Sequence, residues 1–475
     1  MTKAAKIYDY DTERIPLVGS HTNRLAAATK DQIFYNVIPE AVKNALTDKT
    51  SIWLNKRGAF TGHTTLVAGA GRGLYYWART SKTYTVIANK LYAGSSQTAI
   101  LTLTTSTGTV WFTEVSGGTD YLILSDGTDI WTISTGDVVA EIVDADVPVG
   151  PLTPVGLDGY IFVTKSGTDE IWNSDLNIVT DWTATSYLSS EMYPDNLVAL
   201  CRQVNYVVAF GTFSTEFFYD NATATGSPLR RTETVALKVG LASRDSLAQV
   251  DRRIVWVGQS DVGEASVWKF TGLTPEKVSN EFVDKILQNE GSNLSSARGD
   301  IIHHKGHTLY ILNLNARSLA YDLDEKMWVD WSINSSGSHA VLPFNYFVQG
   351  ANNAILCLHN TDGKIYTLVP GTYQDDAGAI LVKIVTGRVD LGNTQQKRLF
   401  RLELIADIES SGTVTLDWSD DDYGTWSTSR SLDLTGRAYT KALGSFRRRA
   451  FRFQHSTNAP FRVEEMELDY SGGVH

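Results

Sequence analysis

The fold is decided by one repeated pattern, most clearly YLILSDGTDIW at residues 121–131 and YIFVTKSGTDEIW at residues 160–172. In both copies a strand of β-branched and aromatic residues leads through a Gly/Asp/Ser/Thr turn into a second strand that ends on Trp. This pattern predicts a β-hairpin. Looser copies follow at residues 206–219, 254–270, 309–321 and 355–366, and an earlier one ends at Tyr92.

The copies are spaced like the blades of a β-propeller. The aromatic residue of the second strand falls at Tyr92, Trp131, Trp172, Phe217, Trp268, Tyr321 and Tyr366, so the intervals are 39, 41, 45, 51, 53 and 45 residues. Four-stranded blades repeat at about 40–50 residues, and stacking them around an axis buries sheet faces that one blade leaves exposed. We therefore predict an all-β chain with a β-propeller of six or seven degenerate blades over residues 81–375. The alternative is a series of unrelated hairpins in β-sandwiches, because the copies are degenerate. No blade carries a repeated WD or kelch signature.

The two ends of the chain are expected to form a second unit. After a linker-like stretch at residues 370–378, strand-like alternation returns over residues 376–475 and predicts a β-sandwich-like domain. Closing a propeller brings the chain ends together, so we expect residues 1–80 to complete a platform with this C-terminal domain. Helices are scarce, with one predicted over residues 279–287 and a second candidate over residues 39–46.

Composition limits the classes of function. The chain has 42 Lys and Arg against 53 Asp and Glu, a net charge of -11. A surface that binds nucleic acid tightly needs clustered Lys and Arg. The acidic balance of this chain therefore favours a surface that DNA can slide past. Cys201 and Cys357 cannot build a disulfide framework or a paired zinc motif, and they indicate a reducing compartment. We find no apolar run that predicts a signal peptide or a membrane segment.

Motifs that are associated with cofactors have structural explanations here. The Gly-rich residues 68–73 lack a Gly-Lys-Ser/Thr ending and precede the strand-like residues 74–77, so they predict a turn before a strand. His303, His304 and His307 stand at the entry to a strand, where alternation splits neighbouring side chains between two faces. No Cys or carboxylate completes a metal site there. We therefore expect no metal and no cofactor.

The stretch SDDDYGTW at residues 419–426 resembles the Asp-box of sialidases and other propeller glycosidases. Such boxes are structural turns, and here Gly424 lies one position late and outside the propeller-like region. We interpret the stretch as a turn between two strands, with Trp418 and Trp426 packed at its base. Glycosidases need two carboxylates across a sugar cleft or a Tyr nucleophile, and nothing in the sequence marks such a set. We therefore predict a protein that is not an enzyme and has no catalytic residues.

The run FRRRAFRF at residues 446–453 is the one local basic cluster. Strand alternation would place Arg448 and Arg452 on one face, and Arg447 and Arg449 with two phenylalanines on the other. Arginines on a strand suit phosphate binding or a subunit contact, and the acidic balance of the chain favours the contact. The candidate subunit or adaptor interface therefore consists of Arg447, Arg448, Arg449 and Arg452.

Motifs along nearly the whole chain resemble one family in order and spacing. They lie at residues 15–19, 34–40, 71–73, 197–220, 240–243, 253–260, 265–272, 275–279, 387–392, 418–420, 425–427 and 447–453. This collinear set is similar to the packaged-DNA-stabilisation proteins of podoviruses, also called tail accessory or nozzle proteins. One departure is Ala59-Phe60, which stands where family members usually show Pro-Gly after Lys-Arg.

The resemblance implies a virion protein in the tail of a short-tailed bacteriophage, assembled in the host cytoplasm. It implies a homo-oligomeric ring, expected to be a hexamer, attached beneath the portal or a ring-shaped adaptor. A tail needle or plug below, and tail fibre or tailspike proteins, are the further partners expected. The ring would retain packaged DNA, and DNA would pass through its lumen without sequence-specific binding. The alternative from another class is a propeller-type carbohydrate-binding or glycoside-hydrolysing tail protein.

Overall fold

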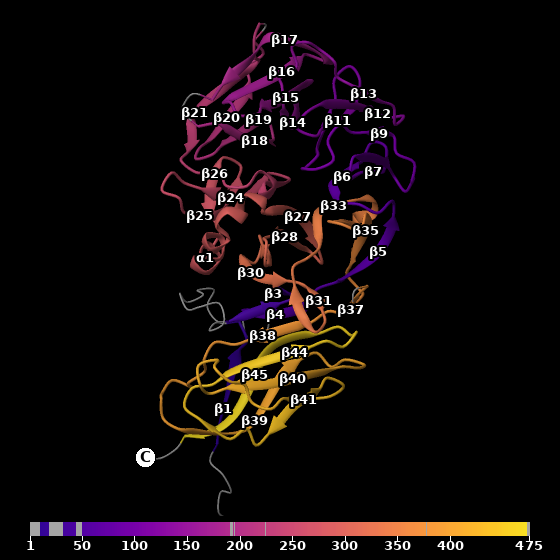
Figure 1. The fold of residues 1–475 in the computed structure, drawn as a ribbon. Coiled ribbons are helices and arrows are strands. Elements are labelled where there is room, and N and C mark those ends of the chain that lie inside the picture. The colour runs from indigo at the N-terminus through magenta and orange to yellow at the C-terminus, as the bar shows by residue number, and fades with distance from the viewer. Residues whose placement is uncertain are drawn as a thin grey trace, which may run out of the picture.

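The computed structural model describes residues 10–18, 32–43, 50–190, 193, 195–223, 225–376 and 378–472. They form a ring of β-sheets with a smaller β-domain beneath it (Figure 1). The described part of the chain holds one α-helix, α1 (Glu281–Glu290), and three short 3-10 helices, η1 (Arg244–Ser246), η2 (Gly291–Ser296) and η3 (Ala351–Asn353). The prediction of an all-β chain is confirmed.

The ring is a β-propeller of antiparallel sheets that follow one another around an axis (Figure 1). The first blade contains β6 (Gly71–Trp77), β7 (Lys82–Ile87), β8 (Lys90–Ala93) and β9 (Leu101–Thr102). The second contains β10 (Trp111–Val115), β11 (Tyr121–Ser125), β12 (Ile130–Ser134) and β13 (Val139–Glu141). The third contains β14 (Pro151–Leu157), β15 (Tyr160–Lys165), β16 (Glu170–Asp175) and β17 (Ile178–Ser189). The next two are β18 (Leu197–Gln203), β19 (Tyr206–Gly211), β20 (Thr215–Asp220) and β21 (Leu229–Leu237); and β22 (Gly240–Leu241), β23 (Ala248–Val250), β24 (Arg253–Gln259), β25 (Ala265–Thr271) and β26 (Thr274–Lys277).

Two further blades complete the ring. They are β27 (Arg298–His304), β28 (His307–Asn313), β29 (Ser318–Asp322) and β30 (Met327–Trp331); and β33 (Phe344–Gln349), β34 (Ile355–His359), β35 (Lys364–Val369) and β5 (Ala59–Thr65). Six of the seven blades are separate sheets, whereas β27–β30 continue into the lower domain. Each aromatic residue that sets the sequence period lies on the third strand of its blade, from Tyr92 on β8 to Tyr366 on β35. The predicted propeller is confirmed.

Neighbouring blades contact one another around the ring, mostly through their first strands, and the contact of β33 with β6 closes the ring. Closure uses β5, which pairs with β35 from Ala59↔Val369 to Thr65↔Lys364. The propeller therefore begins at residue 59, and the expected boundary at residue 81 is wrong. The reason is physical: a strand from the start of the chain locks the last blade, and a Gly turn then leads into β6.

The lower domain, here called the platform, is built from both ends of the chain. One sheet contains β1 (Asp11–Pro16), β3 (Val37–Lys43), β4 (Thr50–Lys56), β45 (Arg462–Gly472), β39 (Lys397–Ala406), β42 (Ala438–Lys441) and β43 (Ser445–Phe446). The facing strands are β2 (Ile33–Tyr35), β38 (Val382–Val385), β44 (Ala450–His455), β40 (Thr413–Ser419) and β41 (Arg430–Asp433). Leu402 and Leu468 of the first sheet share one hydrophobic core with Leu416 and Phe453 of the second.

The platform and the propeller are joined through β2, which pairs with β30 on one side and with β38 on the other. A nine-stranded sheet therefore runs from the β27–β30 blade into the platform. Two small hairpins lie near the junction, β31 (Ile333–Ser335) with β32 (Ser338–Ala340) and β36 (Gln374–Asp375) with β37 (Gly378–Ala379). The stretch at residues 370–378, which the sequence indicated as a linker, thus holds strand β36, and its Asp375 is buried.

The two predicted helices had different outcomes. Helix α1 is confirmed: Val283 N–H donates to the Asn280 side chain at 3.0 Å, and Val283 and Leu287 are buried. The candidate over residues 39–46 is wrong, because residues 39–43 belong to strand β3 and residues 44–46 lie outside the described part. Tertiary pairing with β4, from Val37↔Lys56 to Lys43↔Thr50, overrides the local helical pattern.

Candidate functional site

The arginines after Phe446 do not lie on one regular strand. Strand β43 ends at Phe446 and β44 starts at Ala450, so residues 447–449 lie between two strands. Arg447 and Arg448 are exposed, whereas Arg449 is 1% exposed. The predicted alternation over residues 446–453 is therefore wrong, because the break shifts its phase and buries three consecutive residues, 449–451.

Arg449 is part of the platform interior. Its Nε and Nη2 donate to the two carboxylate oxygens of Asp420 at 2.7 Å each, and its Nη1 donates to Leu443 O at 2.7 Å. Its guanidinium also lies 5.2 Å from the ring centre of Trp418 and 4.7 Å from that of Phe446.

Arg452 is held in a similar way. Its Nε donates to Asp417 at 2.9 Å, and its guanidinium lies 4.2 Å from the ring centre of Trp426. Arg449 and Arg452 therefore serve the fold, and the exposed part of the candidate interface is reduced to Arg447 and Arg448.

We expect Arg449→Ala to lower the free energy of unfolding by about 2–3 kcal/mol, because it removes three charge-assisted hydrogen bonds and two cation–π contacts. The carboxylate of Asp420 is 42% exposed and stays hydrated, which keeps the loss below that of a fully buried pair. Arg448→Ala is the matched control and should change the value by less than about 0.5 kcal/mol. Urea unfolding followed by Trp fluorescence measures both; equal values for the two variants would contradict the assignment.

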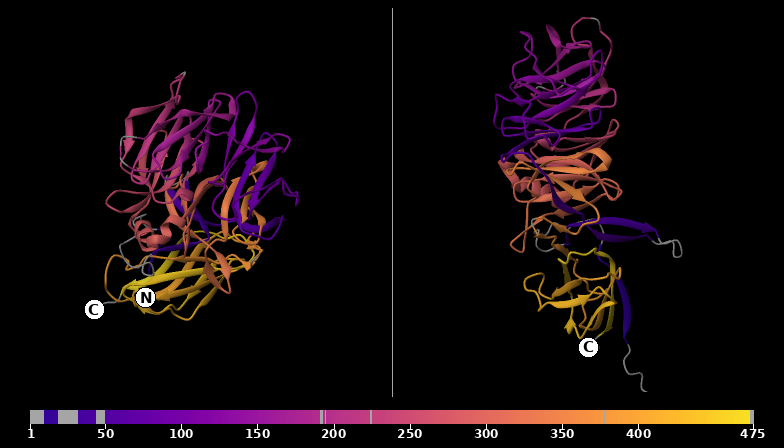
Figure 2. Two further views of the ribbon diagram at one scale, coloured as in Figure 1. Left: turned by 45° about the horizontal axis from the view of Figure 1, so that its top comes forward. Right: turned by 90° about the vertical axis from the view of Figure 1, so that its right-hand side faces the viewer.

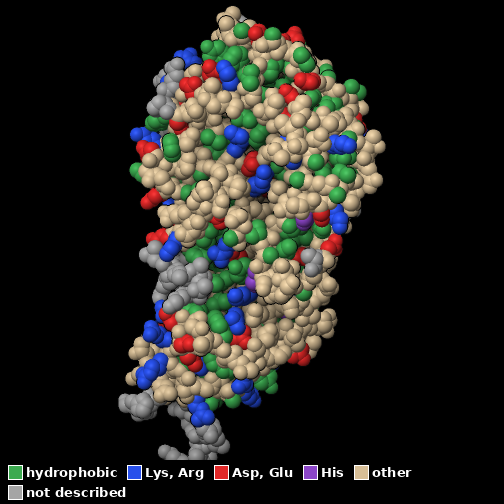
Figure 3. Space-filling view, in the orientation of Figure 1, with side chains coloured by type: hydrophobic (Ala, Val, Ile, Leu, Met, Phe, Trp, Pro, Cys, Tyr) green, Lys and Arg blue, Asp and Glu red, His purple; other side chains and the backbone are tan. Residues whose placement is uncertain are grey.

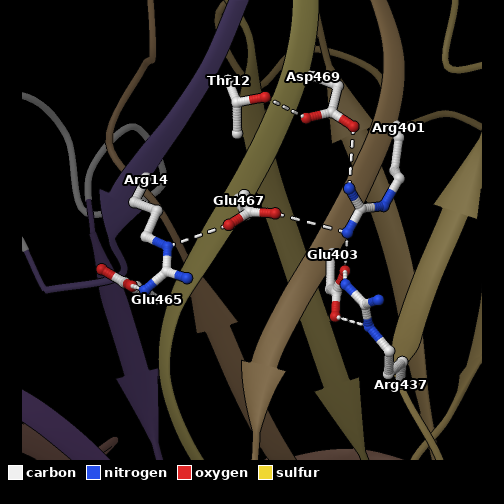
Figure 4. Close-up of polar contacts among 8 residues, drawn as sticks. All are labelled: Thr12, Arg14, Arg401, Glu403, Arg437, Glu465, Glu467 and Asp469. Atoms are coloured by element: carbon white, nitrogen blue, oxygen red, sulfur yellow. Dashed lines mark hydrogen bonds and ion pairs between the residues drawn. The ribbon is translucent and has the colours of Figure 1, made fainter.

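A second charged surface covers the outer face of the platform (Figure 4). Strand β1 lies at the edge of β45, and its Arg14 donates to Glu467 at 3.0 Å and to Glu465 at 3.1 Å. Thr12 Oγ1 donates to Asp469 at 2.7 Å. The same acidic row is paired from the other side by Arg401 on β39, whose Nη1 donates to Asp469 at 2.9 Å.

The network continues from Arg401 to Glu403, which also accepts from Arg437 at 2.7 and 2.6 Å (Figure 4). It holds β1 on the platform, although five of the six residues of β1 are exposed. The sequence does not reveal the part of this surface between β1 and β45, because those residues lie more than 450 positions apart. The available signal was the acidic alternation of Glu465, Glu467 and Asp469, which places three carboxylates on one face of a strand.

A hairpin projects from the side of the molecule. Figure 2 shows β3 and β4 extending away from both units, and β1 running along the edge of the platform. Strand β3 is the edge strand of its sheet. Residues 41, 43 and 50 are exposed, so the outer part of the hairpin contacts little of its own chain.

The Gly-rich stretch has a structural role. Gly69 bridges to Asp362, and β6 begins at Gly71, as the predicted turn before a strand requires. Arg72 is buried and donates to the carbonyls of Ala88, Thr105, Thr107 and Gly108 at 2.6–2.8 Å.

The three histidines do not converge. His303 is exposed, Gly58 N–H donates to His304 at 3.4 Å, and His307 pairs with Asp322 at 2.7 Å. Within the described ranges, no group of three or more His, Cys, Asp or Glu side chains is placed to hold a metal ion.

The Asp-box-like stretch forms a turn between β40 and β41. Asp421 accepts from Thr425 N–H at 2.8 Å and from its hydroxyl at 2.6 Å, and these bonds lower the pKa of Asp421 to about 2. Its carboxylate is thus engaged within the turn. The predicted turn is confirmed.

The architecture defines a β-propeller protein whose chain ends form a platform. Residues 14–373 match the model of the family Phage_stabilise, described as "Bacteriophage P22 Gp10, beta-propeller". The chain therefore belongs to the Phage_stabilise family and is a phage structural protein. The resemblance seen in the sequence is confirmed.

Solved structures with similar folds are distant. A streptogramin B lyase is 13% identical with a TM-score of 0.43, covering 66% of this chain and 97% of that one. YCF48 bound to D1 peptide is 12% identical with a TM-score of 0.40, covering 66% and 98%. The N-terminal domain of Nup159 is 9% identical with a TM-score of 0.37, covering 71% and 98%.

No curated protein matches the sequence significantly. In the described part of the chain, no helix is long and apolar enough to cross a membrane.

Proposed function

We propose that the protein forms a ring in the tail of a short-tailed phage, below the portal and adaptor, where it retains packaged DNA and forms the conduit for its ejection. The observation that carries this proposal is the family match across residues 14–373. The ring is a homo-oligomer, with six copies as the expected number. Its neighbours are the portal or adaptor above, a needle or plug below, and fibres or tailspikes at the side.

Several physical features support this role. A closed propeller fused to a platform through a shared sheet is rigid, which suits a part of a tube. The net charge of -11 disfavours a tight grip on DNA. The β3–β4 hairpin projects from the body and the charged β1 surface lies at the edge of the platform, so both suit contacts between neighbours in an oligomeric ring.

The proposed oligomeric ring is tested directly by negative-stain imaging of the purified protein, alone and mixed with adaptor-loaded portal. Rings with a central opening, seated on the adaptor, are the expected result. Monomers that never join the adaptor at micromolar concentrations would refute the proposal. Turnover or tight binding of a glycan by the isolated protein would instead support the carbohydrate alternative.

Arg447→Ala with Arg448→Ala is expected to leave the free energy of unfolding unchanged and to weaken binding to adaptor-loaded portal by about tenfold or more. The reason is that both side chains are exposed on an acidic chain. The matched control is Arg230→Ala with Arg252→Ala, two exposed propeller arginines, which should bind normally. Sedimentation binding measures the effect. Unchanged attachment of the first variant would remove these two arginines from the interface.

A further inference from the structure

The axis of the propeller contains a cavity of about 320 Å³. Its lining comes from all seven blades, with Tyr75, Trp111, Pro154, Arg202, Arg244, Arg298 and Tyr346 among its residues. A second cavity, of about 500 Å³, shares Thr109, Trp111, Arg244, Asp245 and Arg298 with the first. Figure 3 shows basic and acidic side chains close together at the centre of the propeller.

Two arginines line both cavities, and one of them, Arg298, is engaged by its neighbours. Its Nη1 donates to Tyr346 Oη at 2.8 Å, and its Nη2 donates to Thr109 Oγ1 at 3.1 Å. The same Nη2 pairs with Asp245 at 3.2 Å, and Thr109 in turn donates to Asp245 at 2.7 Å. The carboxylate of Asp245 therefore offsets part of the positive charge of both arginines, because it also interacts electrostatically with Arg244.

Arg244 is different, because only part of its guanidinium has a partner. Its Nε donates to Val198 O at 2.8 Å, and its guanidinium lies 5.5 Å from the ring centre of Trp111. No protein acceptor within the described residues takes up Nη1 or Nη2. The Nε bond and the Trp111 ring fix the plane of the group, so this edge is held in position beside the cavity.

The remaining carboxyls of the cavity walls do not neutralise Arg244. Asp126 lies near Arg72, and its carboxylate accepts from Thr128 N–H at 2.9 Å within its own turn. Burial raises the pKa of Asp300 to about 8, so this carboxyl is mostly uncharged at neutral pH. Arg244 and Arg298 thus share the single carboxylate of Asp245, and one positive charge in excess remains beside the cavity of an acidic protein.

We propose that this cavity binds a carboxylate or phosphate group through Nη1 and Nη2 of Arg244. A planar guanidinium edge matches two oxygens of either group, and the pair of parallel hydrogen bonds gives both strength and orientation. The group can belong to a free anion or to an acidic peptide segment that reaches the mouth of the cavity. This inference is independent of the ring proposed above.

The test is calorimetric titration of the full-length protein with inorganic phosphate, with acetate and with tetraglutamate. Wild type should bind at least one of them, and Arg244→Gln should weaken that binding about 10- to 100-fold, the effect of losing charge-assisted bonds. Arg244→Lys keeps the charge but loses the pair of parallel hydrogen bonds, so its affinity should lie between those of wild type and Arg244→Gln. Tighter binding of tetraglutamate than of acetate would identify a peptide as the source of the carboxylate; equal binding would identify a free anion.

Arg252→Gln is the matched control. Arg252 is exposed and lines neither of the two cavities. Its variant should bind as wild type does. Absence of binding by wild type, or equal weakening in Arg252→Gln and Arg244→Gln, would overturn the proposal. Thermal unfolding of each variant shows whether it is folded. If Arg244→Gln does not fold, the comparison of Arg244→Lys with wild type still tests the proposal.

Discussion

Replacing Arg57 with Leu is expected to lower the free energy of unfolding by about 3–5 kcal/mol, the cost of breaking a buried ion pair from one side. Arg57 is fully buried, and its Nη1 and Nη2 donate to the carboxylate of Asp375 at 2.9 and 2.7 Å. Its other protons go to Asn36 Oδ1 at 3.0 Å, Gly58 O at 2.7 Å and Ser332 O at 2.8 Å. Leu at this position would leave the buried Asp375 carboxylate without its counter-ion and would remove the guanidinium donors to the carbonyls of Gly58 and Ser332.

The position of the pair explains why the effect should be large. Asn36 belongs to the platform side, Ser332 follows the blade that continues into the platform, and Asp375 follows the last blade. Asp375 also accepts from Phe60 N–H at 2.8 Å, at the start of the strand that closes the ring. Arg57 thus ties the closure of the propeller to the platform through one guanidinium.

Urea unfolding measures the effect, and a double-mutant cycle with Asp375→Leu isolates the pair. The double variant should lose clearly less stability than the sum of the two single variants, because no unpaired buried charge remains. Arg14→Ala is the control: its ion pairs are made by a side chain that is 61% exposed, and the cost should be at most about 1 kcal/mol. Additive losses at Arg57 and Asp375 would show that the pair is not coupled.

The propeller could be predicted because its signal is local. Each blade carries a short hairpin with an aromatic residue on its third strand, such as Trp131 on β12 and Trp172 on β16, and local pairs are set by neighbouring residues. The repeat length then specifies how the hairpins combine. The turn at Asp421 was also predictable, because its acceptors and donors lie within a few residues.

Features that join distant parts of the chain could not be predicted. The pairing of β5 with β35 joins residues about 300 positions apart, and no local pattern marks it. The position of Arg449 was predicted wrongly because strand alternation was extended through the break at residues 447–449, between β43 and β44, where Arg449 bridges to Val389. Arg244 and Arg298 lie on different blades, so their common cavity appears only when the ring closes.

Lys56 lies close to the Arg57 pair and should make stability depend on pH. Its side chain is buried, and Nζ donates to Thr457 O at 2.8 Å. Desolvation, with the nearby charges of Arg57 and Lys305, lowers the pKa of Lys56 from 10.5 to about 7, and Asp375 opposes the shift. Its Nζ lies 5.9 Å from the ring centre of Tyr373. Burial, together with the charge of Lys56, lowers the pKa of His455 to about 3.

The sign of the effect follows from counting protons. Between pH 7 and 10.5 the unfolded chain holds a proton on Lys56 that the folded chain has released, so the free energy of unfolding rises with pH there. The slope of the free energy of unfolding against pH should approach about 1 kcal/mol per pH unit, slightly below the limit for one full proton. Below pH 7 both states are protonated, the slope vanishes, and the folded protein bears the full cost of a buried ammonium.

Lys56→Met should therefore be more stable than wild type at pH 6, and this advantage should shrink steadily between pH 7 and 10. Lys56→Gln, which keeps a hydrogen-bond donor for Thr457 O but has no titrating amine, should show the same change in slope. Urea unfolding at intervals of one pH unit, at constant ionic strength, provides the measurement.

If the difference in the free energy of unfolding between wild type and both variants stays constant across this range, Lys56 remains charged in the folded protein. Its ammonium must then be hydrated from the neighbouring cavity of about 330 Å³. A slope that changes in Lys56→Met but not in Lys56→Gln would instead assign the effect to packing around Thr457, because the two variants differ in polarity and not in titration.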